Sequence, residues 1–243
     1  MKLAQTLMST EQESCPRALP GRFALYSIVL LAVHLTVGAA IGAASDGASI
    51  SFSLDFPNSS PEHYQISVDS DGKTHYVSSG RISQDSDATD DYETDVTLSD
   101  ATRTRIFELA AQARYFSGKV DSGNKKLAFT GAKKLVYKDD KRNSSAEYNY
   151  STQPAVQQLT TLFQSVSATL EFGRRLTYYH RYQKLALDDE TKRMEDQARS
   201  GELAEVKAVA PILQMIYDDT SVLKVVRARA LRILQMPPVA SRN

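Results

Sequence analysis

The chain has 243 residues, 42% of them hydrophobic, and its 29 basic and 29 acidic residues cancel to a formal net charge of zero. This neutrality argues against a dedicated nucleic-acid-binding protein, because contacts to phosphates need an excess of lysine and arginine. The single cysteine, Cys15, excludes a disulfide within the chain, so any exported part must be stabilised by packing.

Residues 23–44 form an apolar run that contains no charged side chain and no proline. As a helix this run is roughly 33 Å long, enough to cross a hydrocarbon core of about 30 Å. Arg17 and Arg22 precede it, and no basic residue follows it until Lys73. The asymmetry predicts that the leader, residues 1–22, stays in the cytoplasm while the bulk of the chain lies outside.

Two fates of the run remain open. As an uncleaved signal anchor, Phe23–Ala44 contacts the membrane as a span. As a signal peptide, it is cut near the small residues Gly42, Ala43 and Ala44, and the remainder is secreted. In a bacterial-type cell the first anchors the protein in the cell envelope with its C-terminal bulk outside the cytoplasm, and the second secretes it. A buried helix of a cytoplasmic protein is a third, less favoured interpretation.

Residues 49–150 are predicted to form a sheet domain. Apolar and polar residues alternate without a fault over Ser49–Asp55, a pattern typical of a half-buried strand. A second strand carries Tyr64, Ile66 and Val68, and the turn at 69–72 leads into a return strand at 73–78.

Six acidic residues follow in a segment that we expect to be a solvated loop. Dense carboxylates also suggest calcium. The spacing does not match a helix-loop-helix calcium loop, because the sixth place is not glycine and Val96 occupies the twelfth, so calcium binding stays open. The six residues are Asp85, Asp87, Asp90, Asp91, Glu93 and Asp95.

A helix is predicted after this loop. Thr97 or Ser99 caps its start, an apolar stripe runs from Ile106 to Phe116, and Gly118 ends it. Three short strands are then expected at 126–130, 133–138 and 145–150. The resulting fold class is α+β: a small antiparallel sheet with one packed helix, followed by an all-helical segment and preceded by the signal or transmembrane helix.

One part of the sheet domain resembles a known family. The spacing Pro61-x-x-Tyr64-x-Ile66-x-Val68-x-x-Asp71-Gly72-x-x-x-Tyr76, followed by a capped helix and more strands, is similar to an exported bacterial domain of unknown function. The resemblance covers about 100 residues and implies export. That family typically carries a Cys-Pro pair and a second cysteine, whereas this chain has Ser60-Pro61, so a role of those thiols does not carry over.

Residues 153–236 are predicted to form a helical segment. Pro154 starts a helix whose apolar stripe ends at Leu170, and we expect Gly173 to interrupt it before helix resumes over 176–198. Ser200-Gly201 breaks the chain again. Pro211 predicts a kink or two shorter helices, and the last helix covers 221–236.

The stretch from Arg174 to Tyr182 is the most distinctive candidate for a binding surface, because mixtures of tyrosine and arginine are favoured at protein interfaces. A protein partner, lipid headgroups or an anionic polymer would each fit it. The alternative is that the tyrosines only pack the helix onto the sheet. The candidate residues are Arg174, Arg175, Tyr178, Tyr179, His180, Arg181 and Tyr182.

No motif of a known active site is present, and no metal ligand set or cofactor is predicted. His63 and His75 flank the predicted hairpin, which brings them near each other, but two imidazoles without a third ligand make a poor zinc site. We therefore expect an exported or membrane-anchored, non-catalytic protein that acts through protein or envelope contacts. The alternative is an envelope hydrolase that uses His63 or His75 in an unfamiliar site.

Overall fold

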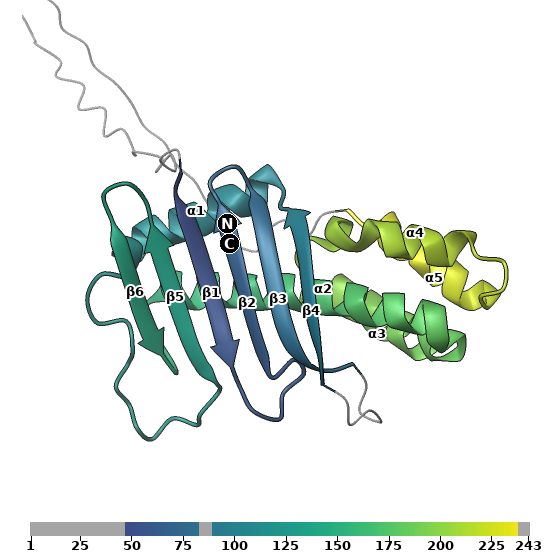
Figure 1. The fold of residues 1–243 in the computed structure, drawn as a ribbon, viewed down its shortest axis with the longest axis horizontal. Coiled ribbons are helices and arrows are strands. Elements are labelled where there is room, and N and C mark those ends of the chain that lie inside the picture. Colours follow the sequence, from purple (N-terminus) through teal and green to yellow (C-terminus); the bar gives the residue numbers. More distant parts are fainter. Residues whose placement is uncertain (1–46, 83–88, 238–243) are drawn as a thin grey trace, which may run out of the picture. The chain divides into compact units, whose positions relative to one another are not determined.

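Six antiparallel strands form one sheet in the order β4-β3-β2-β1-β5-β6 (Figure 1). The structure is a computed structural model that describes residues 47–82 and 89–237. With five α-helices in the described part, it confirms the α+β class. The strands are β1 (Ser49–Asp55), β2 (His63–Asp69), β3 (Lys73–Arg81), β4 (Thr89–Thr97), β5 (Ala132–Lys138) and β6 (Asn143–Tyr148).

The period-two pattern of the strands divides the sheet into an inner and an outer face. On β1, Ile50, Phe52 and Leu54 are buried, whereas the serines between them are half-exposed. Phe52 lies opposite Ile66 on β2 and Leu135 on β5, so the inner side chains of three strands meet in one layer. This layer is the core on which the helices pack.

The prediction of a solvated loop for the acidic segment is wrong in its second half. Residues 89–97 form the edge strand β4, in which Asp91, Glu93 and Asp95 point outward while Tyr92, Thr94 and Val96 are half-buried. The alternation was present in the sequence but was hidden by the density of carboxylates. The predicted strand at 126–130 is also wrong, because this segment is a loop that exposes Phe129. Residues 83–88 lie outside the described part.

Helix α1 (Asp100–Gln112) begins where Ser99 was expected to cap it. The Ser99 hydroxyl accepts a hydrogen bond from the backbone N–H of Thr102, whereas the other candidate cap, Thr97, belongs to β4. Gly118 does not end the helix. The chain leaves α1 through η1 (Arg114–Phe116), three consecutive residues with positive φ of 52°, 53° and 63°.

Helix α2 (Pro154–Tyr182) is continuous through Gly173, so the predicted interruption is wrong. A Cβ atom at Gly173 would lie 2.5 Å from Cγ1 of Val209, and glycine is therefore explained by the close approach of another segment. The first half of α2 packs on the inner face, where Phe163 stacks on Phe52 with ring centroids 5.4 Å apart. Two helices, α1 and α2, thus lie on this face rather than the single one expected (Figure 1).

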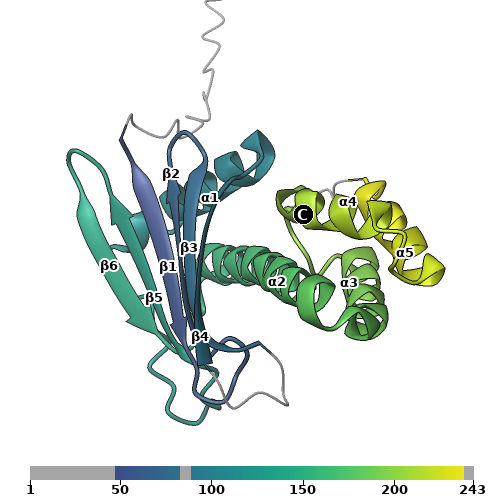
Figure 2. The same cartoon turned by 45° about the vertical axis from the view of Figure 1, so that its right-hand side comes forward.

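The length of α2 explains why a separate helical unit exists. Its 29 residues span roughly 43 Å, whereas six strands about 4.8 Å apart are only about 24 Å wide. The second half of α2 therefore runs past β4 and packs against two of three further helices, α3 and α4, while the third, α5, packs on those two (Figure 2). These are α3 (Leu187–Ser200), α4 (Ala210–Asp218) and α5 (Lys224–Leu234), with the short turns η2 (Lys184–Ala186) and η3 (Val206–Val209) between them.

Some of the observed helix ends in this unit agree with those predicted from the sequence, and one does not. Gly201 ends α3 in a left-handed conformation, and Pro211 lies in the first turn of α4, so the two shorter segments η3 and α4 replace a kinked helix. The break after α2 was missed: Gln183 has φ of −144° and leads into η2, where helix was expected to continue.

The leader 1–22, the apolar run 23–44 and the cleavage position near Ala44 lie outside the described residues. Within 47–82 and 89–237, no helix is both long and apolar enough to span a bilayer.

Candidate functional site

The seven candidate binding residues do not form one exposed face. Arg174 and Tyr179 are buried, and Arg175, Tyr178 and His180 are half-buried, whereas Arg181 and Tyr182 are exposed. Three of the seven, Arg174, Arg175 and His180, make internal polar contacts that lead to different parts of the fold. Partner binding by any of them stays a prediction.

Glu171, one turn before Arg174, is buried between α2 and the sheet with 4% of its surface exposed. Its Oε1 accepts hydrogen bonds from the hydroxyl of Tyr76 at 3.0 Å and from that of Ser78 at 2.6 Å, both on β3. Burial and the Glu171 carboxylate raise the pKa of Tyr76 far above its ordinary value, so this hydroxyl remains a donor.

Arg174 extends the same contact to two strands. Its Nη2 donates to the backbone carbonyl of Gly80 on β3 at 3.2 Å and to that of Asp90 on β4 at 2.7 Å. Its Nη1 lies 3.5 Å from Oε2 of Glu171 and has no hydrogen-bond partner among the described residues. The guanidinium also lies 5.5 Å from the ring centroid of Tyr92. Arg174 therefore fastens α2 to the sheet.

Arg175 connects α2 to α3. Its Nε donates to Oε1 of the buried Glu190 at 2.7 Å, and its guanidinium lies 4.7 Å from the ring centroid of Phe172. Arg193 donates to the other oxygen of Glu190. Burial, followed by the nearby Glu190 carboxylate, raises the pKa of Tyr179 above its ordinary value.

The end of α2 is joined to the turn between α4 and α5 by Asp219. Its Oδ2 accepts hydrogen bonds from Nε2 of His180 at 2.9 Å and from Nζ of Lys184 at 2.6 Å. Its Oδ1 accepts from the backbone N–H and the hydroxyl of Ser221 at 2.9 and 2.6 Å. The Lys184 ammonium, then Ser221, with a smaller share from His180, hold the pKa of Asp219 well below its usual value.

Four large apolar side chains lie exposed on the two segments that Asp219 joins, and we call this surface the tip. The exposed fractions are 61% for Tyr182, 80% for Leu185, and 47% for both Leu223 and Val225. The Tyr182 ring lies 5.1 Å from that of Tyr178, measured between centroids. The tip therefore combines an exposed apolar surface with underlying segments that the hydrogen bonds of Asp219 hold in place.

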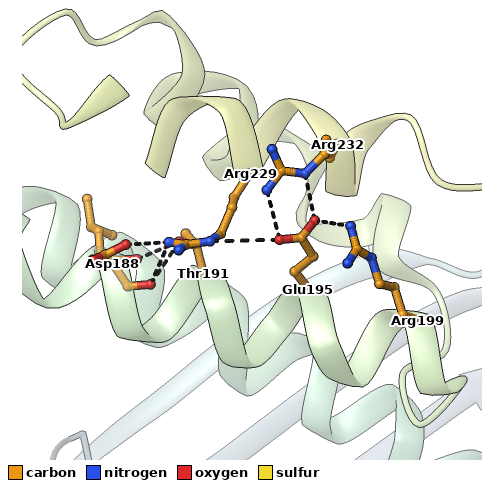
Figure 3. Close-up of polar contacts among 7 residues, drawn as sticks. Asp188, Thr191, Glu195, Arg199, Arg229 and Arg232 are labelled. Atoms are coloured by element: carbon orange, nitrogen blue, oxygen red, sulfur yellow. Dashed lines mark hydrogen bonds and ion pairs between the residues drawn. The ribbon is translucent and has the colours of Figure 1, made fainter. Parts of the chain in front are cut away.

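A second carboxylate holds α3 and α5 together behind the tip. Glu195 on α3 is 5% exposed and accepts a two-pronged contact from Arg232 on α5, at 2.7 and 3.0 Å (Figure 3). Arg199 donates to the same carboxylate at 2.6 Å, and Arg229 bridges it to Asp188. Arg232 contributes most to lowering the pKa of Glu195. The arginines of α5 are thus engaged internally.

The outer face of the sheet brings serine, histidine and aspartate into one row. On β1, β2 and β3, Asp55 lies opposite His63, and His63 lies opposite Ser79. Oδ1 of Asp55 is 2.6 Å from Nδ1 of His63. Side chains directly opposite one another have Cβ atoms about 5 Å apart, so Ser79 is the cross-strand neighbour of His63 on the side away from Asp55.

A second row has the same order on β4, β3 and β2. Asp95 lies opposite His75, and His75 lies opposite Ser67, with 2.8 Å between Oδ1 of Asp95 and Nδ1 of His75. Here Nε2 of the ring faces the carboxylate of Glu93 at 3.7 Å. The expected proximity of His63 and His75 is wrong, because four residues, about 13 Å, separate their places along the hairpin.

No three histidine, cysteine, aspartate or glutamate side chains within the described ranges are placed to hold a metal ion. The outward carboxylates Asp91, Glu93 and Asp95 follow one another along an extended strand. They do not wrap around a common point as calcium ligands do.

Sequence reasoning missed the carboxylates that organise this region: Glu171, Glu190, Glu195 and Asp219. Each resembles an ordinary surface acid in the sequence, because at least one of its partners comes from a distant element. Only the spacing of Glu171 and Arg174, one turn apart on an apolar helix, indicated a buried pair.

Models of known protein families were compared with the chain and none matches, and no curated protein matches it either.

We predict that Asp219→Asn lowers the melting temperature at pH 7, because His180 and Lys184 lose their common acceptor. The depressed pKa means that ionised Asp219 stabilises the fold above pH 3.8 and that this contribution is lost as pH falls below that value. The difference between variant and parent should therefore shrink in acid, as thermal unfolding followed by circular dichroism at several pH values will measure. The neighbouring Asp218→Asn serves as the control. A difference that is constant with pH would contradict the role of the charge.

Proposed function

We propose that this chain is an exported, non-catalytic protein of the cell envelope that binds a partner protein through the tip. The observation that carries the proposal is the exposure of Tyr182, Leu185, Leu223 and Val225 together at the end of the helical unit. Isolated exposed apolar residues are common, but a group of four on two joined segments is typical of an interaction surface.

The composition of the tip fits the anatomy of protein interfaces. Its apolar side chains are aromatic and aliphatic, and the exposed basic residues Arg181, Lys184 and Lys224 are next to them in the chain, as a polar rim requires. Burying one leucine side chain contributes about 1.5–3 kcal/mol, so the group supplies several kcal/mol before the costs of association. The basic rim favours a partner with acidic residues around an apolar pocket.

The hydrogen bonds at the base of the tip support the same proposal. Asp219 fixes the end of α2 against the turn between α4 and α5 before any partner arrives. A surface that is already ordered loses less conformational entropy on binding. Of the predicted binding residues, Arg181 and Tyr182 are the two whose side chains are free to take part.

The envelope assignment rests on the apolar run 23–44 and the basic residues before it. The resemblance to an exported bacterial domain supports it. Both the signal anchor and the cleaved signal peptide remain compatible with a tip that acts outside the cytoplasm.

The double variant Tyr182→Ala and Leu185→Ala tests the tip. A photo-crosslinker at Gln183 in the full chain first identifies the partner in cell envelopes, and affinity is then measured with that purified partner. We expect binding about thirtyfold weaker, because interface anchors contribute about 2 kcal/mol or more.

The control for the tip is Leu127→Ala with Phe129→Ala, which shortens two exposed apolar residues on a loop of the sheet domain. Equal binding by the parent and the tip variant would contradict the proposal. An effect of the same size in the control would also contradict it.

The row Asp55–His63–Ser79 favours hydrolysis as a second candidate function. Asp55 orients the imidazole through Nδ1, and Nε2 is then available to take the proton of the Ser79 hydroxyl as it attacks an ester. Ser67 is less suited, because Glu93 faces Nε2 of His75 in the other row.

An ester assay on the full chain distinguishes the two candidates. Hydrolysis at this row predicts that Ser79→Ala and His63→Ala each reduce turnover by roughly 10⁴-fold, as for other nucleophile–base pairs. Ser67→Ala and His75→Ala are the matched controls and should leave turnover unchanged. Absence of turnover by the parent over a panel of generic esters would eliminate this candidate.

A further inference from the structure

A depression of about 540 Å³ lies where η1 meets the start of β6. We call it the hairpin corner, because the turn between β5 and β6 forms one wall of it. Two arginines, Arg114 and Arg142, line the same depression. Its other lining residues are Ala111, Tyr115, Ser117, Asn143 and Ser144.

The wall formed by η1 adopts a conformation that is unfavourable for its residues. Arg114, Tyr115 and Phe116 have successive positive φ values of 52°, 53° and 63°, a region that side chains other than glycine rarely enter. Three contacts hold the turn: Phe116 is buried, the Ser144 hydroxyl donates to the Tyr115 carbonyl, and the Tyr115 ring lies 4.5 Å from that of Tyr137. Strain that is kept in place by such contacts is a feature of ligand sites.

The hairpin corner has an excess of positive charge. The guanidinium carbon of Arg142 lies 4.1 Å from the ring centroid of Tyr115, and its Nη1 donates a hydrogen bond to Oδ2 of Asp139 at 3.2 Å. The Asp139 side chain is only 5% exposed and also accepts from Tyr137 and two backbone N–H groups, so it presents little negative charge to solvent. Within the described residues Arg114 has no ion pair or side-chain hydrogen bond. The corner and the adjoining turn carry more basic than acidic residues. The basic residues are Arg114, Lys138, Lys141 and Arg142, and the acidic residues are Asp139 and Asp140.

This corner lies at the end of the sheet where β1 begins. Ser49, the first residue of β1, is paired with Lys138, the last residue of β5 (Figure 1). Only five peptide steps separate Ala44 from Ser49, which limits their distance to about 18 Å. If Phe23–Ala44 spans a bilayer, a linker this short allows the hairpin corner to reach the headgroups.

We propose that the hairpin corner binds the phosphate group of an anionic phospholipid. Arginine pairs with phosphate through charge-assisted hydrogen bonds, and two arginines that line one depression can converge on a single phosphate. The site rests on the proposed membrane anchoring. It goes beyond that proposal, because it fixes which end of the sheet domain faces the membrane and leaves the tip for the partner.

The test uses the full chain with Cys15→Ser and Asp140→Cys, carrying an environment-sensitive fluorophore on the turn between β5 and β6. The chain is reconstituted into nanodiscs of phosphatidylcholine, with or without phosphatidylglycerol. Protection of the fluorophore from aqueous acrylamide reports docking. We expect protection in the anionic discs, and a shift of the docking equilibrium of about fivefold for each basic residue removed.

Two variants and one control make the result specific. Arg114→Gln with Arg142→Gln should abolish most of the protection. Arg114→Gln alone should shift the docking equilibrium about fivefold toward the undocked state without disturbing an internal contact. Lys125→Gln with Lys126→Gln removes the same charge from a loop elsewhere in the sheet domain and should have no effect. Equal protection in neutral and anionic discs, or equal effects of variants and control, would overturn the proposal.

Two further outcomes separate this site from the anchoring on which it rests. Retention of the chain in the discs after alkaline carbonate tests anchoring alone. A chain that is retained but unprotected refutes only the headgroup site, whereas a chain that is lost refutes both. Release of the docked fluorophore by inorganic phosphate at constant ionic strength would assign the site to free phosphate and overturn the lipid assignment.

Discussion

The buried pair of Glu171 and Arg174 is the contact on which the arrangement of this protein depends. A carboxylate and a guanidinium removed from water are costly unless each finds partners, and both find them on β3 and β4. Because the pair lies where α2 passes beyond the sheet, it fixes the direction in which the helix leaves. The hydrophobic contact of Phe163 with Phe52 attaches the first half of α2 but leaves its far end unconstrained.

Everything proposed for the helical unit follows from that fixed helix. Arg175 connects it to α3, and Asp219 connects its end to the turn between α4 and α5. The tip is exposed because these contacts use the polar groups of the last two turns of α2 internally and leave Tyr182 and Leu185 outside. The hairpin corner lies on the opposite edge of the sheet, at β6, so a membrane contact and a protein contact do not compete for one surface.

The elements with a clear period were predictable from the sequence, and those governed by distant partners were not. The alternation of Ile50, Phe52 and Leu54 predicted β1, and Ser99 predicted the start of α1. Strand β4 was missed because its outward face is acidic, and Gly173 was misread because its partner Val209 is far along the chain. The candidate stretch from Arg174 to Tyr182 was located correctly on a helix, but spacing alone did not reveal which of its side chains are buried.

A double-mutant cycle on Glu171 and Arg174 tests the central claim most directly. Glu171→Leu, Arg174→Met and the double variant are compared by guanidinium chloride unfolding of the full chain in a mild detergent. Each single change should cost about 3–5 kcal/mol, because it leaves the other charge buried and unpaired. The double variant should cost about 1–3 kcal/mol less than the sum of the two. Additive losses, or a single variant as stable as the parent, would contradict the claim that this pair holds α2 on the sheet.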